Sequence, residues 1–260
     1  MKTIGLALGG GGARGVAHIA YLKAMEGMGY KPDIIAGTSS GAIVGALYAG
    51  GLSPGDIYAM LESLFSIKKR SGASFIKALR RDNIAAALAK QFLSRVLPKK
   101  TFEELDIPLK IVATNFNTLE EKVFDSGDIL PALMGSIAFP SVFVPQKAGD
   151  AYYVDGGATN IVPFDILRND CDVLIAIDVS QVRPNTFKPN IKNALHATWA
   201  ATQESLISSK LEKTPVEIFE RPTFEDVSTM EFYKYKSIYK RAETHSPGFI
   251  EQLNKELMKG

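Results

Sequence analysis

The chain of 260 residues contains a single cysteine and only three histidines. One cysteine, Cys171, excludes an internal disulfide framework and is typical of a reducing compartment. We expect Cys171 to be a small buried side chain in front of a core strand. The histidines, His18, His196 and His245, lie far apart and no acidic cluster has ligand spacing, so we expect no metal site.

Long apolar segments are also missing. No apolar run approaches the ~18 residues of a membrane-spanning helix. The N-terminus has one lysine followed by "TIGLAL", which is shorter than the ~7–15 apolar residues of a secretory signal. The net charge is only +2, which does not favour a nucleic-acid partner. We therefore expect a cytoplasmic protein, with any membrane contact limited to the inner surface.

Short apolar runs alternate with helical patterns, in a chain that is 46% hydrophobic and 22% charged, as globular proteins are. The predicted strands are 3–8, 33–37, 109–116, 121–127, 151–155, 172–180 and 216–220. The predicted helices are 14–27, 40–50, 54–67, 83–97, 128–137, 190–211 and 228–243. This alternation predicts an α/β fold with a largely parallel sheet flanked by helices. Because no linker or repeat interrupts the chain, we expect residues 1–260 to form one domain.

The stretch "LALGGGGARGVAHIAYL" at 6–22 places four glycines between a predicted strand and a predicted helix. Gly10, Gly12 and Gly15 satisfy the dinucleotide-binding pattern G-x-G-x-x-G. That interpretation requires an acid about 20 residues on, at the end of the second strand. Asp33 has nearly this separation but stands at the start of its strand, so we expect no nucleotide and no other cofactor.

The second strand ends instead in Gly37-Thr38-Ser39-Ser40-Gly41, a G-x-S-x-G motif between the run "DIIA" and a predicted helix. Such a strand-to-helix turn forces the serine into a strained conformation and exposes its hydroxyl. Glycines at Gly37 and Gly41 remove the side chains that would collide there. The motif predicts a nucleophilic Ser39.

A serine nucleophile needs a base. None of the three histidines lies in a recognisable loop motif after a strand, so we expect each to be structural or solvated. Asp155, in "AYYVDGGATNIVP", ends a predicted strand and precedes Gly156 and Gly157. Active sites of α/β folds gather at the carboxyl ends of strands, which makes Asp155 the stronger candidate.

The four glycines then suit an oxyanion hole, because successive glycine amides and a following helix N-terminus can face one anion. The residue after the nucleophile, Ser40, can add its own N–H. One such donor contributes on the order of 3 kcal/mol to transition-state stabilisation.

Together these motifs resemble those of the patatin-like phospholipases, particularly short bacterial members. The family's glycine loop is similar to Gly10-Gly11-Gly12-Ala13-Arg14-Gly15, its G-x-S-x-G to residues 37–41, and its D-G-[GA] motif to residues 155–157. The segment 111–145 also resembles the family's approach to the aspartate motif. The resemblance covers roughly residues 3–180 and implies a three-layer patatin-like fold.

The resemblance implies a Ser–Asp dyad that cleaves lipid acyl esters, with phospholipids or lysophospholipids as substrates. Ser39 would attack the ester carbonyl, and Asp155 would take its proton and later activate water. Gly10, Gly11 and Gly12 would bind the oxyanion. Arg14 matches the family's basic position, which we interpret as structural.

Three alternatives stay open. The same acyl-enzyme could pass its acyl group to an acceptor other than water, as in an acyltransferase. The order Ser39, Asp155, His196 also permits the triad of an α/β-hydrolase. A silent lipid-binding protein is the third, although such a protein has no need of the serine, the aspartate and the glycine loop together.

The segment 61–100 combines ten basic residues with two acidic ones, interleaved with apolar residues. It could be a lid or a face that lies on an anionic bilayer. It could also be a solvated face of helices packed on the core, which the residues alone favour. The C-terminal segment 228–260 is amphipathic and predicted to be helical, and could cap the core, pair with another chain or touch a membrane.

Overall fold

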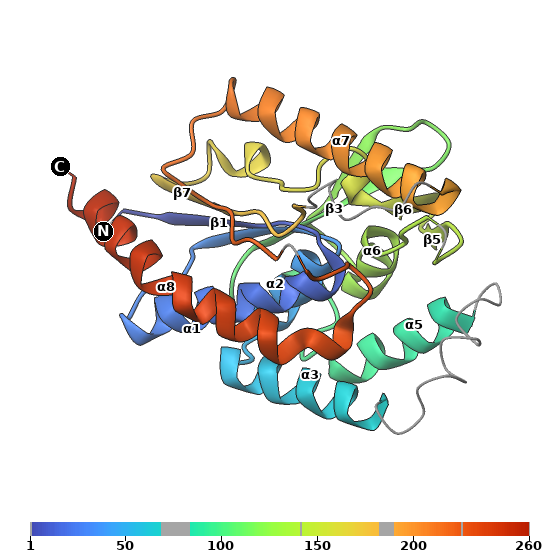
Figure 1. Cartoon of the computed structure of the whole chain (residues 1–260), viewed down its shortest axis with the longest axis horizontal. Helices are drawn as coiled ribbons and strands as arrows, with labels where there is room; N and C mark the ends of the chain where they lie inside the picture. Colours follow the sequence, from blue (N-terminus) through green and yellow to red (C-terminus); the bar gives the residue numbers. More distant parts are fainter. Residues whose placement is uncertain (1, 69–83, 141, 182–189, 225, 260) are drawn as a thin grey trace.

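The computed structural model describes residues 2–68, 84–140, 142–181, 190–224 and 226–259, with the backbone alone at 65–68 and 192. Eight strands form one mixed sheet in the order β5-β6-β3-β2-β1-β7-β8, and β4 pairs with β3 outside this path. Helices cover both faces of the sheet, so the described chain has three layers (Figure 1). The predicted α/β class is confirmed.

The parallel part of the sheet contains β1 (Ile4–Leu8), β2 (Ile34–Thr38), β3 (Leu109–Asn115), β7 (Val173–Ile177) and β8 (Ile218–Glu220). The antiparallel strands are β4 (Glu121–Phe124), β5 (Gln146–Ala148) and β6 (Ala151–Asp155). The sequence missed β5, because three residues are too few to show an alternating pattern.

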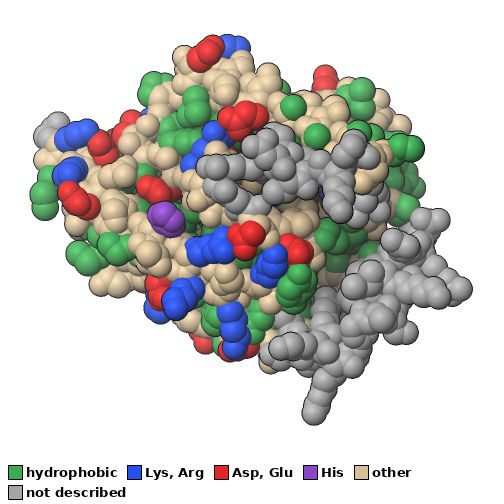
Figure 2. All heavy atoms as spheres, viewed as in Figure 1, with side chains coloured by type: hydrophobic (Ala, Val, Ile, Leu, Met, Phe, Trp, Pro, Cys, Tyr) green, Lys and Arg blue, Asp and Glu red, His purple; other side chains and the backbone are tan. Residues whose placement is uncertain are grey.

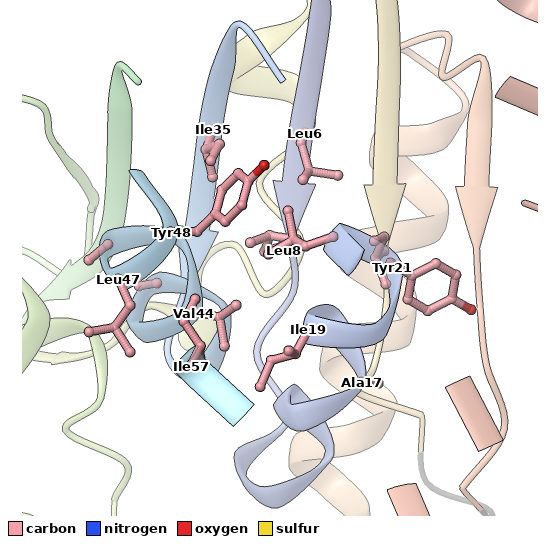
Figure 3. Close-up of a cluster of buried hydrophobic side chains, with 14 of the residues drawn as sticks. Leu6, Leu8, Ala17, Ile19, Tyr21, Ile35, Val44, Leu47, Tyr48 and Ile57 are labelled. Carbon is pink, nitrogen blue, oxygen red and sulfur yellow. The ribbon is translucent and has the colours of Figure 1, made fainter. Parts of the chain in front are cut away.

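One face of the sheet carries α1 (Ala17–Gly27), α2 (Ser40–Ala49), α3 (Pro54–Lys68) and α8 (Tyr235–Met258) (Figure 1). Leu6 and Leu8 of β1 point to this face and pack with Ile19 of α1 and Val44 of α2 (Figure 3). Ala7, between the two leucines, faces the other side, where it packs with Phe164 and Ile207. This alternation places a hydrophobic core on each face of β1.

The other face carries α7 (Ile191–Leu211), and the far end of the sheet carries α5 (Ile84–Val96) and α6 (Ile129–Ser136) (Figure 1). Short 3-10 turns complete the fold, at Gly12–Val16, Phe102–Glu104, Gly156–Ala158, Asp165–Leu167 and Phe232–Lys234. The carboxyl end of the parallel strands points toward α6 and β6.

Strand β3 brings β2 and β6 end to end. Parallel pairing sets Thr38 of β2 opposite Val112, and antiparallel pairing sets Asp155 of β6 opposite Ala113. Since β4 pairs with residues 111–114 on the other edge, β2 and β6 share one edge of β3. The two strands run toward each other along this edge, and their carboxyl ends meet there.

Helix α8 agrees with the helical C-terminal segment expected over 228–260, although it begins later, at Tyr235. It continues through Pro247 to Met258, past residue 243, where the local helical pattern ends. Proline cannot donate to the carbonyl four residues earlier, which here belongs to Glu243. The hydroxyl of Ser246 donates to that carbonyl instead, at 2.9 Å. The helix caps the core through α1, where Tyr21 and Phe249 meet edge to face at 5.2 Å.

The basic segment 61–100 is described in part. Residues 69–83, which include Lys69, Arg70, Lys77, Arg80 and Arg81, lie outside the described residues. In α5, Ala85, Ala86 and Leu93 are buried against the core, while Ile84 and Leu88 are exposed. No helix that the structure describes is both long enough and apolar enough to span a membrane.

Candidate active site

Ser39 lies between β2 and α2 in a backbone conformation rarely adopted by residues other than glycine, with φ 53° and ψ −119°. The flanking glycines make this turn possible. A Cβ at Gly37 would lie 2.6 Å from Cα of Ala42, and one at Gly41 would lie 2.0 Å from the carbonyl oxygen of Leu8. The turn has the strain that the G-x-S-x-G motif predicts.

Asp155 faces Ser39 from the end of β6. The Ser39 hydroxyl donates to Oδ2 of Asp155 at 2.7 Å, although 116 residues separate the two in the chain. The other carboxylate oxygen accepts the N–H of Gly157 at 2.8 Å. The hydroxyl of Thr114 donates to the backbone carbonyl of Asp155 at 3.1 Å. Gly157 thus holds one carboxylate oxygen and Thr114 holds the backbone, while the other carboxylate oxygen points at the serine.

Burial controls the charge of this carboxyl group. Asp155 is 2% exposed. Desolvation raises its pKa to about 6, against the opposing effect of the hydrogen bonds from Gly157 and Ser39. A carboxyl group with this pKa is ionised at neutral pH and still basic enough to accept a proton.

The glycine loop lies against the nucleophile. A Cβ at Gly10 would lie 3.1 Å from Cβ of Ser39. The amide of Gly10, however, donates to the carbonyl of Ile161 at 2.9 Å, which differs from its expected role. Within the part of the chain that the structure describes, no acceptor bonds the amides of Gly11 and Gly12. Ser40 begins α2, so its N–H also lacks an acceptor within the helix.

Arg14 is buried and lies in the turn Gly12–Val16. Its guanidinium donates to the carbonyls of Gln181, Ser180 (3.1 Å) and Gly11 (3.4 Å). Burial lowers its pKa to about 10, and Asp178 opposes this shift. These contacts join the glycine loop to the segment after β7. Gly15, in the same turn, packs against the side chain of Ser40.

The segment after Asp155 forms hydrogen bonds to both the nucleophile motif and the glycine loop, a role that the sequence did not reveal. The carbonyl of Asn160 accepts the hydroxyl of Thr38, the residue before the nucleophile, at 2.7 Å. The next carbonyl, that of Ile161, accepts the amide of Gly10. Gly156 lets this segment turn over β3, since a Cβ there would lie 2.3 Å from the carbonyl oxygen of Val112. The tail of the aspartate motif is therefore in contact with both other motifs.

The three histidines lie in helices α1, α7 and α8. His18 is fully buried, and its Nε2 lies 2.8 Å from the carbonyl oxygen of Gly9. Burial lowers its pKa to about 4, so the ring is neutral at neutral pH. His245 lies in α8 and His196 in α7. The direct bond between Ser39 and Asp155 occupies the position where a triad would place its histidine.

An aromatic cluster borders the dyad. Phe139 follows Ala138, whose carbonyl accepts the backbone N–H of Asp155 at 3.0 Å. The rings of Phe139 and Trp199 meet edge to face at 5.4 Å, and His196 stacks on Phe139 at 6.1 Å. One helical turn beyond Trp199, Gln203 donates to the carbonyl of Gly157 at 3.4 Å. Phe139 and Trp199 thus form an aromatic wall next to the residues that bond Asp155 and Gly157.

Comparison with known families agrees with these motifs. The model of the patatin-like phospholipase family matches residues 6–168, which include the glycine loop, Ser39 and Asp155.

The chain is also similar to curated proteins over nearly its whole length. It is 26% identical to lysophospholipase nte1 of Aspergillus fumigatus over 287 aligned positions, which cover 98% of the chain and 18% of the relative. It is 25% identical to lysophospholipase NTE1 of Kluyveromyces lactis, over 98% of the chain and 20% of the relative. The chain spans about a fifth of the length of these relatives.

Solved structures share the fold at low identity. VipD from Legionella pneumophila superposes with a TM-score of 0.57 and 15% identity, over 98% of this chain and 67% of VipD. A chain of the ExoU–SpcU complex from Pseudomonas aeruginosa superposes with a TM-score of 0.53 and 15% identity, over 100% of this chain and 52% of that chain.

Proposed function

The chain belongs to the patatin-like phospholipase family, and from this premise we propose that it hydrolyses the carboxylic esters of lipids, phospholipids or lysophospholipids among them. The observation that carries the proposal is the 2.7 Å hydrogen bond from the Ser39 hydroxyl to a buried carboxyl group with a pKa of about 6. The names of the lysophospholipase relatives support the same class of substrate.

In the first half of the reaction, Oγ of Ser39 attacks the ester carbonyl carbon while its proton passes to Oδ2 of Asp155. The tetrahedral intermediate then collapses. The C–O bond to the alcohol breaks, and the alcohol leaves with the proton that Asp155 holds. The serine is now acylated, and the carboxylate is ionised again.

In the second half, Asp155 takes a proton from a water molecule as the water attacks the acyl carbonyl. A second tetrahedral intermediate forms and collapses, and Ser39 recovers its proton from Asp155 as the carboxylic acid leaves. One carboxyl group serves as base and acid in turn, for which a pKa near the working pH is favourable.

The oxyanion of both intermediates would be bound by the amides of Gly11, Gly12 and Ser40. Their lack of another acceptor among the described residues supports this assignment. Gly10 supports the loop through Ile161 and completes the close approach to Ser39. Each amide that bonds the oxyanion contributes on the order of 3 kcal/mol.

We assign the aromatic wall of Phe139 and Trp199 to the acyl chain. Both rings are half-buried and lie next to the loop that holds Asp155. Replacing Trp199 by alanine should lower kcat/KM for a decanoyl ester several-fold and leave that for an acetyl ester nearly unchanged. Phe219 of β8, whose ring meets Phe164 at 6.0 Å in the core between the sheet and α7, provides a matched aromatic-to-alanine control.

We further propose that residues 1–260 act as one catalytic domain. The single sheet that reaches β8 and the packing of α8 on α1 support this view.

Hydrolysis of p-nitrophenyl esters tests the main proposal. Ser39→Ala and Asp155→Asn should each abolish the activity, and Ser39→Ala should also prevent labelling by a fluorophosphonate probe. His196→Ala and His245→Ala should keep most of the activity. A folded histidine variant that loses it would support the triad of an α/β-hydrolase. Product analysis with glycerol or a thiol present would reveal an acyltransferase by the formation of a new ester or thioester.

We also propose that the side of the molecule around α5 contacts anionic membranes. A hollow of about 340 Å³ between α5, α6 and β5 is bordered by Lys90, Lys100 and Lys147 with one acid, Asp128, over an apolar floor that includes Met134. Ile84 and Leu88 are also exposed on α5, outside the lining of the hollow. Around α8, in contrast, basic and acidic side chains are mixed (Figure 2), as in the ion pairs Lys236–Glu62 and Arg241–Asp226. Net positive charge beside apolar side chains suits an anionic bilayer.

Cosedimentation of the Ser39→Ala variant with vesicles tests this contact without substrate turnover. We expect binding to phosphatidylglycerol vesicles, weaker binding at high salt, and a loss of binding in the double variant Lys90→Glu/Lys147→Glu. Lys31→Glu/Lys213→Glu changes the charge equally at the opposite end of the strands and serves as the control. Equal binding to phosphatidylcholine, or no effect of salt, would refute the proposal.

A further inference from the structure

The C-terminal turn of α6 touches both members of the dyad. The hydroxyl of Ser136, the last residue of α6, accepts the backbone N–H of Ser39 at 2.8 Å. Two residues on, the carbonyl of Ala138 accepts the backbone N–H of Asp155 at 3.0 Å. Ser39 follows β2 and Asp155 ends β6, so residues 136–138 form a bridge between two separate parts of the sheet.

The amide of Ser39 depends on a side-chain acceptor. It follows the last residue of β2 and precedes the first residue of α2, so neither the sheet nor the helix supplies its acceptor. Ser136 is fully buried, and water has no access to its side chain from the surface. Removing the hydroxyl would leave the amide of Ser39, the strained residue itself, without an acceptor. Such backbone strain persists only where the surroundings fix it.

We propose that Ser136 is a positioning residue of the dyad. Its hydroxyl fixes the nucleophile's backbone while Ala138 fixes that of the base, and together they set the 2.7 Å separation of the Ser39 hydroxyl and the Asp155 carboxylate. The inference rests on the proposed Ser–Asp dyad and adds to it the residue that keeps the serine hydroxyl at hydrogen-bonding distance from the carboxylate.

This role has consequences that a purely structural serine would lack. Without the Ser136 hydroxyl, the turn at Ser39 relaxes and the serine hydroxyl moves away from Asp155. A displacement near 1 Å can lower a catalytic rate about 100-fold. The hydrogen bond from Ser39 also lowers the pKa of Asp155, so weakening it raises that pKa further. The rate and the pH profile should therefore change together.

The test compares Ser136→Ala, Ser136→Cys and Ser136→Thr with the wild type on a short p-nitrophenyl ester between pH 5 and 8. We expect Ser136→Ala to lower kcat about 10- to 100-fold with KM nearly unchanged, and to move the acid limb of the profile to higher pH. Ser136→Thr keeps the hydroxyl and should restore much of kcat. Ser246→Ala removes a buried hydroxyl in α8, far from the dyad, and should change neither quantity.

A wild-type kcat in folded Ser136→Ala, or a lower kcat with an unmoved acid limb, would overturn the inference. If Ser136→Ala does not fold, Ser136→Cys decides, since sulfur is a weak acceptor of similar shape. A wild-type kcat in that variant would overturn the inference, and a several-fold loss would support it. If the wild type cleaves no ester, or Ser39→Ala retains activity, the proposed dyad fails instead.

Discussion

Two buried aspartates at the carboxyl ends of strands share nearly the same local structure. Asp155 ends β6 and Asp178 follows β7, and they are 2% and 0% exposed. Each accepts a serine hydroxyl, from Ser39 at 2.7 Å and from Ser180 at 2.6 Å. Each also accepts the backbone amide two residues further on, at 2.8 Å in both cases.

The two aspartates differ in whether a basic side chain forms an ion pair with them. Nε of Arg221 lies 2.7 Å from Oδ2 of Asp178, and the same guanidinium reaches Glu204. Among the described residues, no lysine or arginine forms an ion pair with Asp155. The ion pair ties Asp178 to the segment after β8 and anchors the chain, whereas burial raises the pKa of Asp155, which can then take up and release a proton. The same local motif thus becomes an anchor in one place and a candidate base in the other.

The largest expected effect is on catalytic activity, which one substitution should nearly remove and the other should largely keep. Asp155→Asn should lower kcat/KM at pH 7.5 by about 10³-fold or more, because asparagine cannot accept the serine's proton. Asp178→Asn should keep kcat/KM within about tenfold, since Asp178 touches neither the serine nor the glycine amides. Kinetics on p-nitrophenyl esters, normalised to folded protein, measure both. Similar losses in the two variants would erase the distinction.

The same two substitutions should rank the other way in stability, where the change at Asp178 is the damaging one. Asp178→Asn leaves Arg221 without its buried partner and should lower the free energy of unfolding by about 3 kcal/mol. The partial exposure of Arg221 and its second contact with Glu204 keep the loss from being larger. Urea unfolding at pH 7.5 measures it. An unchanged midpoint would show that Asp178 is no anchor.

Asp155→Asn should instead stabilise the fold at neutral pH. The pKa of Asp155 is about 6 in the folded chain and 3.8 ordinarily. Protonation therefore stabilises the folded state fully below about pH 4, and this contribution is lost as the pH rises through 6. Asparagine does not ionise, so the variant should have a free energy of unfolding about 2–3 kcal/mol higher than the wild type at pH 7.5. Unfolding curves should show this gain disappearing at pH 4, whereas a constant difference would contradict the pKa.

The sequence predicts the pieces of this site better than their arrangement. The glycine loop, Ser39 and Asp155 each stand at a boundary that local patterns reveal, because glycines and apolar runs act over a few residues. That β2 and β6 meet end to end depends on the register of both against β3, and no local pattern contains it.

Other features depend on distant partners. Ser136 lies in a predicted helix and becomes relevant only because its hydroxyl meets an amide 97 residues away. Asp178 resembles Asp155 in the sequence, and the arginine that distinguishes them lies 43 residues further on. Helix α8 passes Pro247 because Ser246 bonds the carbonyl that proline leaves, which propensity alone does not predict.

The rate of fluorophosphonate labelling of Ser39 between pH 4.5 and 8 tests the central claim most directly, because it reports activation of the serine by its base. We predict one inflection near pH 6, with the rate about tenfold below its plateau at pH 5, in the wild type and unchanged in His196→Ala and His245→Ala. The histidine variants matter because a free imidazole titrates near 6.5. An inflection that is absent from this range, or that disappears with either histidine, would contradict Asp155 as the base.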